Sequence, residues 1–339
     1  MRDDQDRPAG APGREHGTLR LVQRTPSWEP PDAAGPAGGE AEFALTGELP
    51  RGHPVFGDGP RRFHDLQAGA EMVREIGELL GQSLFGVPAN RTGVFYRFAV
   101  RTPDIAAWRD TGTGSPALLT TLLRVRPDKV IDGVPRALEF RTDLQLDDRP
   151  CGAGTANVVF LPPVVYRNHQ ARGRTSPPRE PAATGGAGRT AEDPPSADPP
   201  SVDPAEVGRA APGNVLVHAP SEAAHGRLSA GIRPPAHWPL PRVTEHGHVP
   251  AAVQLEALRQ TALLCAGRSH RFAPDRCALS SLEVHFRGYA EPAAPMRCAA
   301  VAGPCDRDAQ GRRQVPVTLT LAQTGRAVLE AVVTVVEDF

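Results

Sequence analysis

The chain has 339 residues, with 38 Lys and Arg against 39 Asp and Glu, so its formal net charge is −1. This balance leaves no basic excess to bind nucleic acid or an anionic membrane, and neither partner is expected. Pro (37) and Gly (34) are frequent while aromatic residues make up only 5%. Such a composition indicates folded domains joined by disordered segments.

The targeting and cysteine signals favour a cytoplasmic protein. The N-terminal stretch MRDDQDRPAGAPG lacks the apolar core of a secretory signal, and no apolar run approaches the ~18 residues of a membrane span. The five cysteines are scattered, and none forms a Cys-x-x-Cys pair. Free thiols in a reducing compartment are the simplest interpretation.

The first folded block is predicted over 42–170, after a largely disordered N-terminus at 1–41. Apolar residues recur at three- and four-residue steps from Met72 to Phe85, which predicts a helix that Gly86 and Pro88 end. Four strand-like runs follow it: GVFYRFAV, ALLTTLLRV, RALEFRTDLQL and TANVVFLPPVVY.

Residues 171–213 are predicted to be a disordered linker, because their only large aliphatic residues are Val202 and Val207 and they contain no aromatic residue. A second block over 214–339 has the same order as the first. A helical pattern begins after Pro250 and is expected to end near Gly267. The strand-like runs CALSSLEVHFRGYA, PMRCAAVA, RQVPVTLTLAQ and AVLEAVVTVVED come next, and the last two predict an antiparallel meander.

The two predicted helices share a short motif, Glu-x-x-Arg followed by Glu or Gln. It reads EMVRE from Glu71 in the first helix and EALRQ from Glu256 in the second, and a histidine lies just upstream of each. Together with the common order of elements, this repeat indicates an internal duplication. The predicted fold class is α+β. A long helix wrapped by an antiparallel sheet is the hotdog arrangement, so two such halves would form a double hotdog.

The second motif carries the candidate chemistry. Glu256, Arg259 and Gln260 lie at positions i, i+3 and i+4 of one helix face. A surface salt bridge is the ordinary interpretation of such a triplet. The small and apolar residues around it instead indicate an enclosed helix, where a charge must be paired or functional.

In the functional interpretation, Glu256 has a raised pKa and acts as a general base, and Arg259 holds a phosphate or carboxylate. His248 lies just ahead of the helix and exchanges a proton with the substrate. The free amide groups near Ala251 polarise a thioester carbonyl.

Other site classes have little support. His237, His246 and His248 have no carboxylate or cysteine at a matching spacing, so no metal site is expected. His53 and His64 are uninformative as single residues. Serine-hydrolase, P-loop and dinucleotide motifs are absent from the sequence, and no cofactor is expected.

The segments NVLVHAP and GHVPAAVQLEALRQTALL resemble the second repeat of the A-factor biosynthesis (AfsA) family, whose hallmark reads approximately DHVPGMxLLEAxRQ. These are γ-butyrolactone synthases of actinomycetes, and the Ala-, Arg-, Gly- and Pro-rich composition fits such a source. The segments ELPRGHPVF, FHDLQAGAEMVREIGELLGQSLFGVP and PPVVYRNHQARG resemble the family's first repeat. The resemblance covers most of 44–172 and 214–339.

The resemblance implies a double hotdog that condenses a β-ketoacyl group with the hydroxyl of dihydroxyacetone phosphate, in signalling or secondary metabolism. The acyl group arrives as a thioester of acyl carrier protein or coenzyme A. Glu256 and His248 are then the expected catalytic residues. The expected substrate-binding residues are Arg259, Gln260, Ala251, Arg74, Glu71 and His64. The sequence departs from the hallmark at Gly247, Ala251 and Ala252, and Glu75 replaces a glutamine in the first repeat.

Two alternatives stay open on the sequence. A hotdog thioesterase or 3-hydroxyacyl dehydratase would use His248 and Glu256 without a phosphate-holding arginine. A non-catalytic protein would bind an acyl or butyrolactone ligand without turnover. Because the second repeat has the fuller motif, one functional site is expected, in a monomeric pseudo-dimer or a homodimer.

Overall fold

The computed structural model describes residues 20–23, 39–49, 55, 58–59, 63–110, 117–175, 201–223, 226–235, 238, 244 and 247–339. Three α-helices lie in these ranges: α1 (Leu66–Leu84), α2 (Pro163–Thr175) and α3 (Ala251–His270). None of the helices in these ranges combines the length and apolar character of a membrane span.

The strands of the first half are β1 (Arg20–Gln23), β2 (Ala41–Glu48), β3 (Thr92–Arg101), β4 (Leu118–Ile131), β5 (Val134–Leu146) and β6 (Arg149–Leu161). Those of the second half are β7 (Val217–Ala223), β8 (Arg227–Ile232), β9 (Cys277–Phe286), β10 (Met296–Ala302), β11 (Asp306–Arg307), β12 (Arg313–Gln323) and β13 (Arg326–Glu337). The 3-10 helices are η1 (Ile105–Trp108), η2 (Pro204–Val207), η3 (Pro212–Asn214) and η4 (Pro274–Arg276).

The strands form one antiparallel sheet in which the two halves have the same order. The first half runs β1-β2-β4-β5-β6-β3 toward the centre, and the second runs β7-β8-β10-β12-β13-β9. In each half the long helix follows the second strand and precedes the third. At the centre β3 pairs with β9, with Arg97 opposite His285 and Arg101 opposite Ser281. This repetition confirms the expected α+β fold of two hotdog units.

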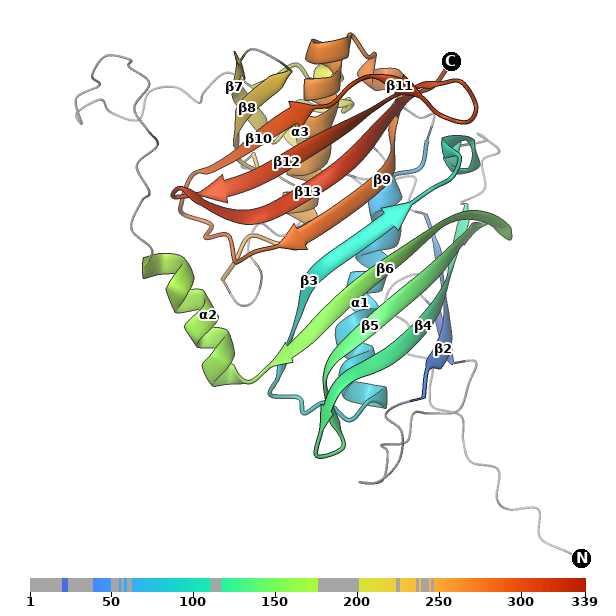
Figure 1. The fold of residues 1–339 in the computed structure, drawn as a ribbon, viewed down its shortest axis with the longest axis vertical. Coiled ribbons are helices and arrows are strands. Elements are labelled where there is room, and N and C mark those ends of the chain that lie inside the picture. Colours follow the sequence, from blue (N-terminus) through green and yellow to red (C-terminus); the bar gives the residue numbers. More distant parts are fainter. Residues whose placement is uncertain are drawn as a thin grey trace, which may run out of the picture.

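Helices α1 and α3 lie on the same face of the sheet, behind it in the view of Figure 1. Every residue of α3 from Val253 to Ala266 is buried, polar residues included. Its contacts are with β7, β8, β10, β12 and β13 of its own half and with η2 and η4. The helix is therefore enclosed all round, as its small and apolar sequence predicts.

The predicted helix ends hold for α1 and shift for α3. Phe85 caps α1 and Gly86 adopts a positive φ of 66°, a backbone conformation that glycine tolerates best. α3 continues past Gly267 to His270, and Arg271 takes the left-handed conformation at its C-cap. A single glycine near a helix end is tolerated when the surrounding residues pack well.

The predicted linker 171–213 is wrong at both ends. Residues Pro163–Thr175 form α2, which begins within the run that was predicted to be a strand. Residues 201–213 contain η2 and the start of η3. Val202 is 6% exposed and Val207 is fully buried, so the few apolar residues of this segment are its anchors. Asp203 caps η2 by accepting a hydrogen bond from the Ala205 amide. Residues 176–200 lie outside the described ranges.

The N-terminal prediction also needs correction. Within 1–41, which was expected to be largely disordered, Arg20–Gln23 forms β1 and pairs with β2. Four residues are too few for the alternating pattern by which a strand is recognised in a sequence. The remaining residues before Gly39 lie outside the described ranges.

Candidate functional site

The motif of α3 is buried. Glu256 and Gln260 are fully buried and Arg259 is 7% exposed. Their spacing sets them on one helix face, where Arg259 Nε lies 3.4 Å from Glu256 Oε2 and Gln260 Nε2 donates to Glu256 Oε1 at 2.6 Å. The surface salt-bridge interpretation is therefore excluded.

The main partner of Glu256 is Arg209, which follows η2 and which the sequence reasoning placed in the linker. Arg209 Nε donates to Glu256 Oε1 at 2.8 Å, and its Nη2 donates to Oε2 at 2.6 Å. The pair is bidentate, a geometry that guanidinium and carboxylate groups favour. Arg209 is 4% exposed. The one sequence signal for it is its position after Val207, an apolar residue in an otherwise polar segment.

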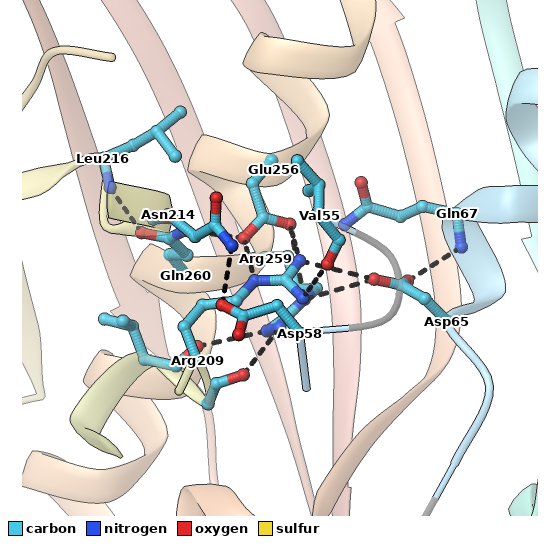
Figure 2. A network of polar contacts seen from close by, with 12 residues as sticks. Val55, Asp58, Asp65, Gln67, Arg209, Asn214, Leu216, Glu256, Arg259 and Gln260 are labelled. Atoms are coloured by element: carbon cyan, nitrogen blue, oxygen red, sulfur yellow. Dashed lines mark hydrogen bonds and ion pairs between the residues drawn. The ribbon is translucent and has the colours of Figure 1, made fainter. Parts of the chain in front are cut away.

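The first half contributes Asp65, the N-cap residue of α1 (Figure 2). Its Oδ2 lies 3.5 Å from Arg209 Nη2 and 3.6 Å from Arg259 Nε. Arg209 Nη1 also donates to the Val55 carbonyl at 2.6 Å. The helix start of one half thus meets the central helix of the other, whereas sequence reasoning paired each histidine with the motif of its own repeat.

Backbone carbonyls fix the orientation of Arg259. Its Nη1 donates to the Val207 carbonyl at 3.2 Å, and its Nη2 donates to the Gly208 carbonyl at 3.0 Å. Gln260 is also held on both sides, because its Oε1 accepts from the Leu216 amide and its Nε2 donates to the Asn214 carbonyl. Neither side chain depends on solvent for its position.

The prediction that Glu256 has a raised pKa is wrong. Burial alone would raise the pKa of this carboxyl, but the charges of Arg209 and Arg259 and the hydrogen bonds from Arg209 and Gln260 outweigh it and lower the pKa. Burial lowers the pKa of Arg259, as does the neighbouring charge of Arg209. Glu256 is thus an ionised carboxylate whose two oxygens both accept hydrogen bonds from the protein.

A small cavity of about 50 Å³ lies between the two halves. The first half lines it with Phe63, His64, Asp65, Leu66, Ile105 and Trp108, and the second half with Gly208, Arg209, Arg259, Leu263, Pro274 and residues 277–279. Gly59 completes the lining. The volume is enough for one or two water molecules or a small functional group. Two guanidinium groups, one carboxylate and one imidazole therefore share one apolar-walled space.

Of the expected first-repeat residues, only His64 reaches this cavity. Arg74 and Glu71 instead form an ion pair of 2.6 Å with each other along α1, with Arg74 44% exposed. The expectation that Arg74 works beside Arg259 is corrected, since Arg209 occupies that position. A residue one turn into α1 faces away from the cavity that the start of the helix lines.

His248 lies in a different cluster. Its Nε2 is 2.9 Å from both the Tyr166 hydroxyl and Gln170 Nε2, which come from α2. Its ring stacks on Tyr289 at 4.3 Å between centroids. Glu256 accepts its hydrogen bonds from Arg209 and Gln260. Glu256 and His248, the two residues expected to be catalytic, therefore do not form a pair.

Ala251 is the first residue of α3, and its N-cap residue Pro250 makes no side-chain capping hydrogen bond. The first-turn amides of α3 therefore receive no side-chain cap from this residue. His53, His237 and His246 lie outside the described residues. Within the described ranges, no three His, Cys, Asp or Glu side chains gather as metal ligands would.

Two sequence matches relate this chain to known proteins. The A-factor biosynthesis hotdog domain, AfsA, matches residues 190–336. The 2-oxo-3-(phosphooxy)propyl 3-oxoalkanoate synthase of Streptomyces coelicolor A3(2) is 30% identical over 238 residues, which are 68% of this chain and 66% of that protein. The match thus spans just under two thirds of the relative's length.

Solved structures of low sequence identity are also similar. The 12:0-ACP thioesterase from Umbellularia californica has a TM-score of 0.48 at 11% identity, over 87% of this chain and 93% of that one. An acyl-ACP thioesterase from Bacteroides thetaiotaomicron has 0.45 at 10%, over 87% and 97%. At these scores the two structures do not indicate the activity of this chain. The family match over residues 190–336 and the relative confirm the resemblance to the A-factor biosynthesis hotdog (AfsA) family that was seen in the sequence.

Proposed function

We propose that this protein is an acyltransferase of the γ-butyrolactone synthase type. It transfers a β-ketoacyl group from a thioester of acyl carrier protein or coenzyme A to the hydroxyl of dihydroxyacetone phosphate. The product is then a 2-oxo-3-(phosphooxy)propyl ester, the compound named for the Streptomyces relative.

The observation that carries this proposal is the pair Arg209 and Arg259 on one cavity between the two halves. Guanidinium groups attract a phosphate by their positive charge, which they keep at every physiological pH. A hydrolase acting on a simple acyl thioester has no need for two buried cations at its site. A phosphorylated acceptor would supply the negative charge that both arginines attract.

In the proposed step the hydroxyl oxygen attacks the thioester carbonyl carbon, the C–O bond forms and the C–S bond breaks. His64, which lines the cavity, takes the hydroxyl proton and returns it to the departing thiolate. Glu256 and Asp65 act as positioning residues, because they hold the two arginines. Gln260 in turn holds Glu256.

His248 and Ala251 are proposed to serve the thioester, through the imidazole and the first-turn amides of α3. Ala251 lies about 7 Å before Glu256 along α3, at ~1.5 Å of rise per residue, and His248 precedes the helix. His64 lines the same cavity as the two arginines and His248 does not, so His64 is the proposed base for an acceptor held by the arginines. The variants His64→Ala and His248→Ala separate the two roles.

The test is product mass spectrometry with purified protein and a β-ketoacyl thioester, with and without dihydroxyacetone phosphate. Wild type is expected to give a phosphate-containing ester that Arg259→Met reduces by at least about a hundredfold, as loss of a charged contact does. Arg268→Ala is the matched control, since this arginine of the same helix pairs with Glu206 and Glu222 at the surface.

Other outcomes would contradict the proposal. Free acid or dehydrated acyl product without the acceptor would favour a thioesterase or dehydratase. Binding of the thioester without any product would favour a non-catalytic binding protein.

A further inference from the structure

Gln67 is a buried amide whose polar atoms the fold leaves unused. Its side chain belongs to the first turn of α1 and the residue is 2% exposed, yet neither Oε1 nor Nε2 has a hydrogen-bond partner in the described part of the chain. Its backbone amide, in contrast, donates to Asp65 Oδ1 at 3.0 Å. An unpaired buried amide destabilises a protein, so a long apolar side chain would serve the fold better.

Gln67 follows two residues of the candidate site, although it is not itself among the residues that line the cavity. Asp65 and Leu66, the two residues before it, line the cavity. The Gln67 side chain reaches from α1 toward Val55 and the Arg209–Glu256 pair (Figure 2). The amide is thus directed at the charge network that holds the two arginines, from the opposite half of the molecule.

The neighbouring groups do not pair with this amide. Both oxygens of Glu256 already accept hydrogen bonds, and a carboxylate would offer nothing to Oε1. Arginine side chains are donors only, so they offer no acceptor to Nε2 of Gln67. The donors of Arg209 are directed to Glu256 and to the Val55 carbonyl. A partner for Gln67 must present a donor and an acceptor close together.

A hydroxyl next to a ketone has these two features, and a phosphate does not. We propose that Gln67 determines specificity for the acceptor, with Oε1 accepting from its hydroxyl and Nε2 donating to its ketone. This inference rests on the proposed function and adds to it the recognition of a phosphorylated α-hydroxyketone. The arginines hold the phosphate end, and Gln67 orients the hydroxyl that attacks.

The experiment measures binding without the thioester, by calorimetric titration of three small phosphates. Dihydroxyacetone phosphate has both groups, hydroxyacetone phosphate lacks the hydroxyl and glycerol 3-phosphate lacks the ketone. Wild type is expected to bind the first at least about tenfold more tightly than either of the others, because a site built for a hydrogen bond rejects an analogue that leaves it unpaired.

Gln67→Met, of similar length, is expected to bring the three affinities within about threefold of each other and to raise the melting temperature of the unliganded protein. Gln254→Met is the matched control. This buried glutamine in the first turns of α3 also has an unpartnered Oε1, while its Nε2 donates to the Val249 carbonyl. It is expected to leave the preference among the three phosphates unchanged.

Equal wild-type affinities for the three phosphates would overturn the inference, even if Gln67→Met failed to fold. A preference that persists in Gln67→Met would also overturn it and leave the amide to a bound water. A preference that depends on Gln67, without any ester product from wild type, would support the inference as ligand recognition while the proposed acyl transfer fails.

Discussion

Glu256 lies between two guanidinium groups, and this environment sets its protonation before any substrate arrives. Burying a carboxylate alone would favour the neutral acid, but Arg209 and Arg259 reverse that preference. A carboxylate that receives hydrogen bonds from Arg209 and Gln260 is poorly placed to receive a proton from a substrate. The negative charge of Glu256 is therefore best explained as the group that keeps two buried cations in place.

Replacing Glu256 by Gln is expected to destabilise the protein by about 3–5 kcal/mol, because two buried arginines lose their main counter-charge. Urea unfolding at pH 7 measures the change. Glu283→Gln is the control, since Glu283 pairs with Arg97 at the surface with more than half of each side chain exposed. Its effect is expected within ~0–1 kcal/mol. Equal effects of the two variants would contradict the buried network.

The lowered pKa of Glu256 predicts a pH dependence of stability. The folded state binds the proton more weakly than the unfolded state, so this stabilisation is complete above the unfolded pKa of about 4.3. It is lost as the pH falls through the folded pKa. The difference in unfolding free energy between wild type and Glu256→Gln is expected to be constant from pH 7 to about 5 and to shrink below it. A difference that grows on acidification would reverse the assigned direction.

At the scale of elements, the two equivalent helices are buried to different extents. α3 is enclosed along fourteen consecutive residues, whereas α1 carries the exposed pair of Glu71 and Arg74. The two copies of the repeated motif therefore differ in burial. The copy in α3 is buried among charged partners, and the copy in α1 lies on an exposed helix face. This asymmetry supports one functional site, built from the middle of α3 and the start of α1.

Two glycines of α1 test its packing against the sheet. A Cβ at Gly81 would lie 2.3 Å from Phe160 Cζ, so Gly81→Ala is expected to destabilise by about 1–3 kcal/mol despite its better helix propensity. A Cβ at Gly69 would meet Leu119 at an ordinary 3.6 Å, so Gly69→Ala is expected to stabilise by up to ~1 kcal/mol. Thermal unfolding of both variants is the measurement, and a stabilising Gly81→Ala would show that α1 packs differently.

At the scale of the whole molecule, the two halves are joined by more than the chain that connects them. β3 pairs with β9 at the centre of the sheet, and Asp65 of the first half faces Arg209 and Arg259. The cavity exists only where both halves meet. Neither half alone would contain the candidate site.

Cutting the chain between the halves tests this dependence. A protease site inserted within residues 176–200, which lie outside the described ranges, is expected to be cleaved without separating the halves. The two fragments should elute together in size-exclusion chromatography and separate only in urea, which is the control that cleavage is complete. Fragments that separate in native buffer would show that the connecting chain, and not the shared sheet, holds the molecule together.

Much of the fold could be predicted from the sequence, because helices and strands carry local signals. The apolar periods located α1 and α3, Gly86 and Pro88 marked the end of α1, Pro250 marked the start of α3, and alternation identified most of the strands. The length of the disordered linker was overestimated, because that prediction rested on the average composition of residues 171–213. Three residues of the segment are buried in the fold: Val202, Val207 and Arg209, the last of which pairs with Glu256. An average over the composition does not detect such single residues.

The sequence by itself determined the duplication, the helix that carries Glu256, Arg259 and Gln260, and the resemblance to the AfsA family. Only the tertiary structure decided which charges meet, since Arg209 is 47 residues from Glu256 and 144 residues from Asp65 along the chain. It also decided the proton state of Glu256, which depends on the balance between burial and two neighbouring cations. Periodicity reports how a residue faces its own helix, whereas pairing and electrostatics depend on distances that exist only after the sheet has closed around both helices.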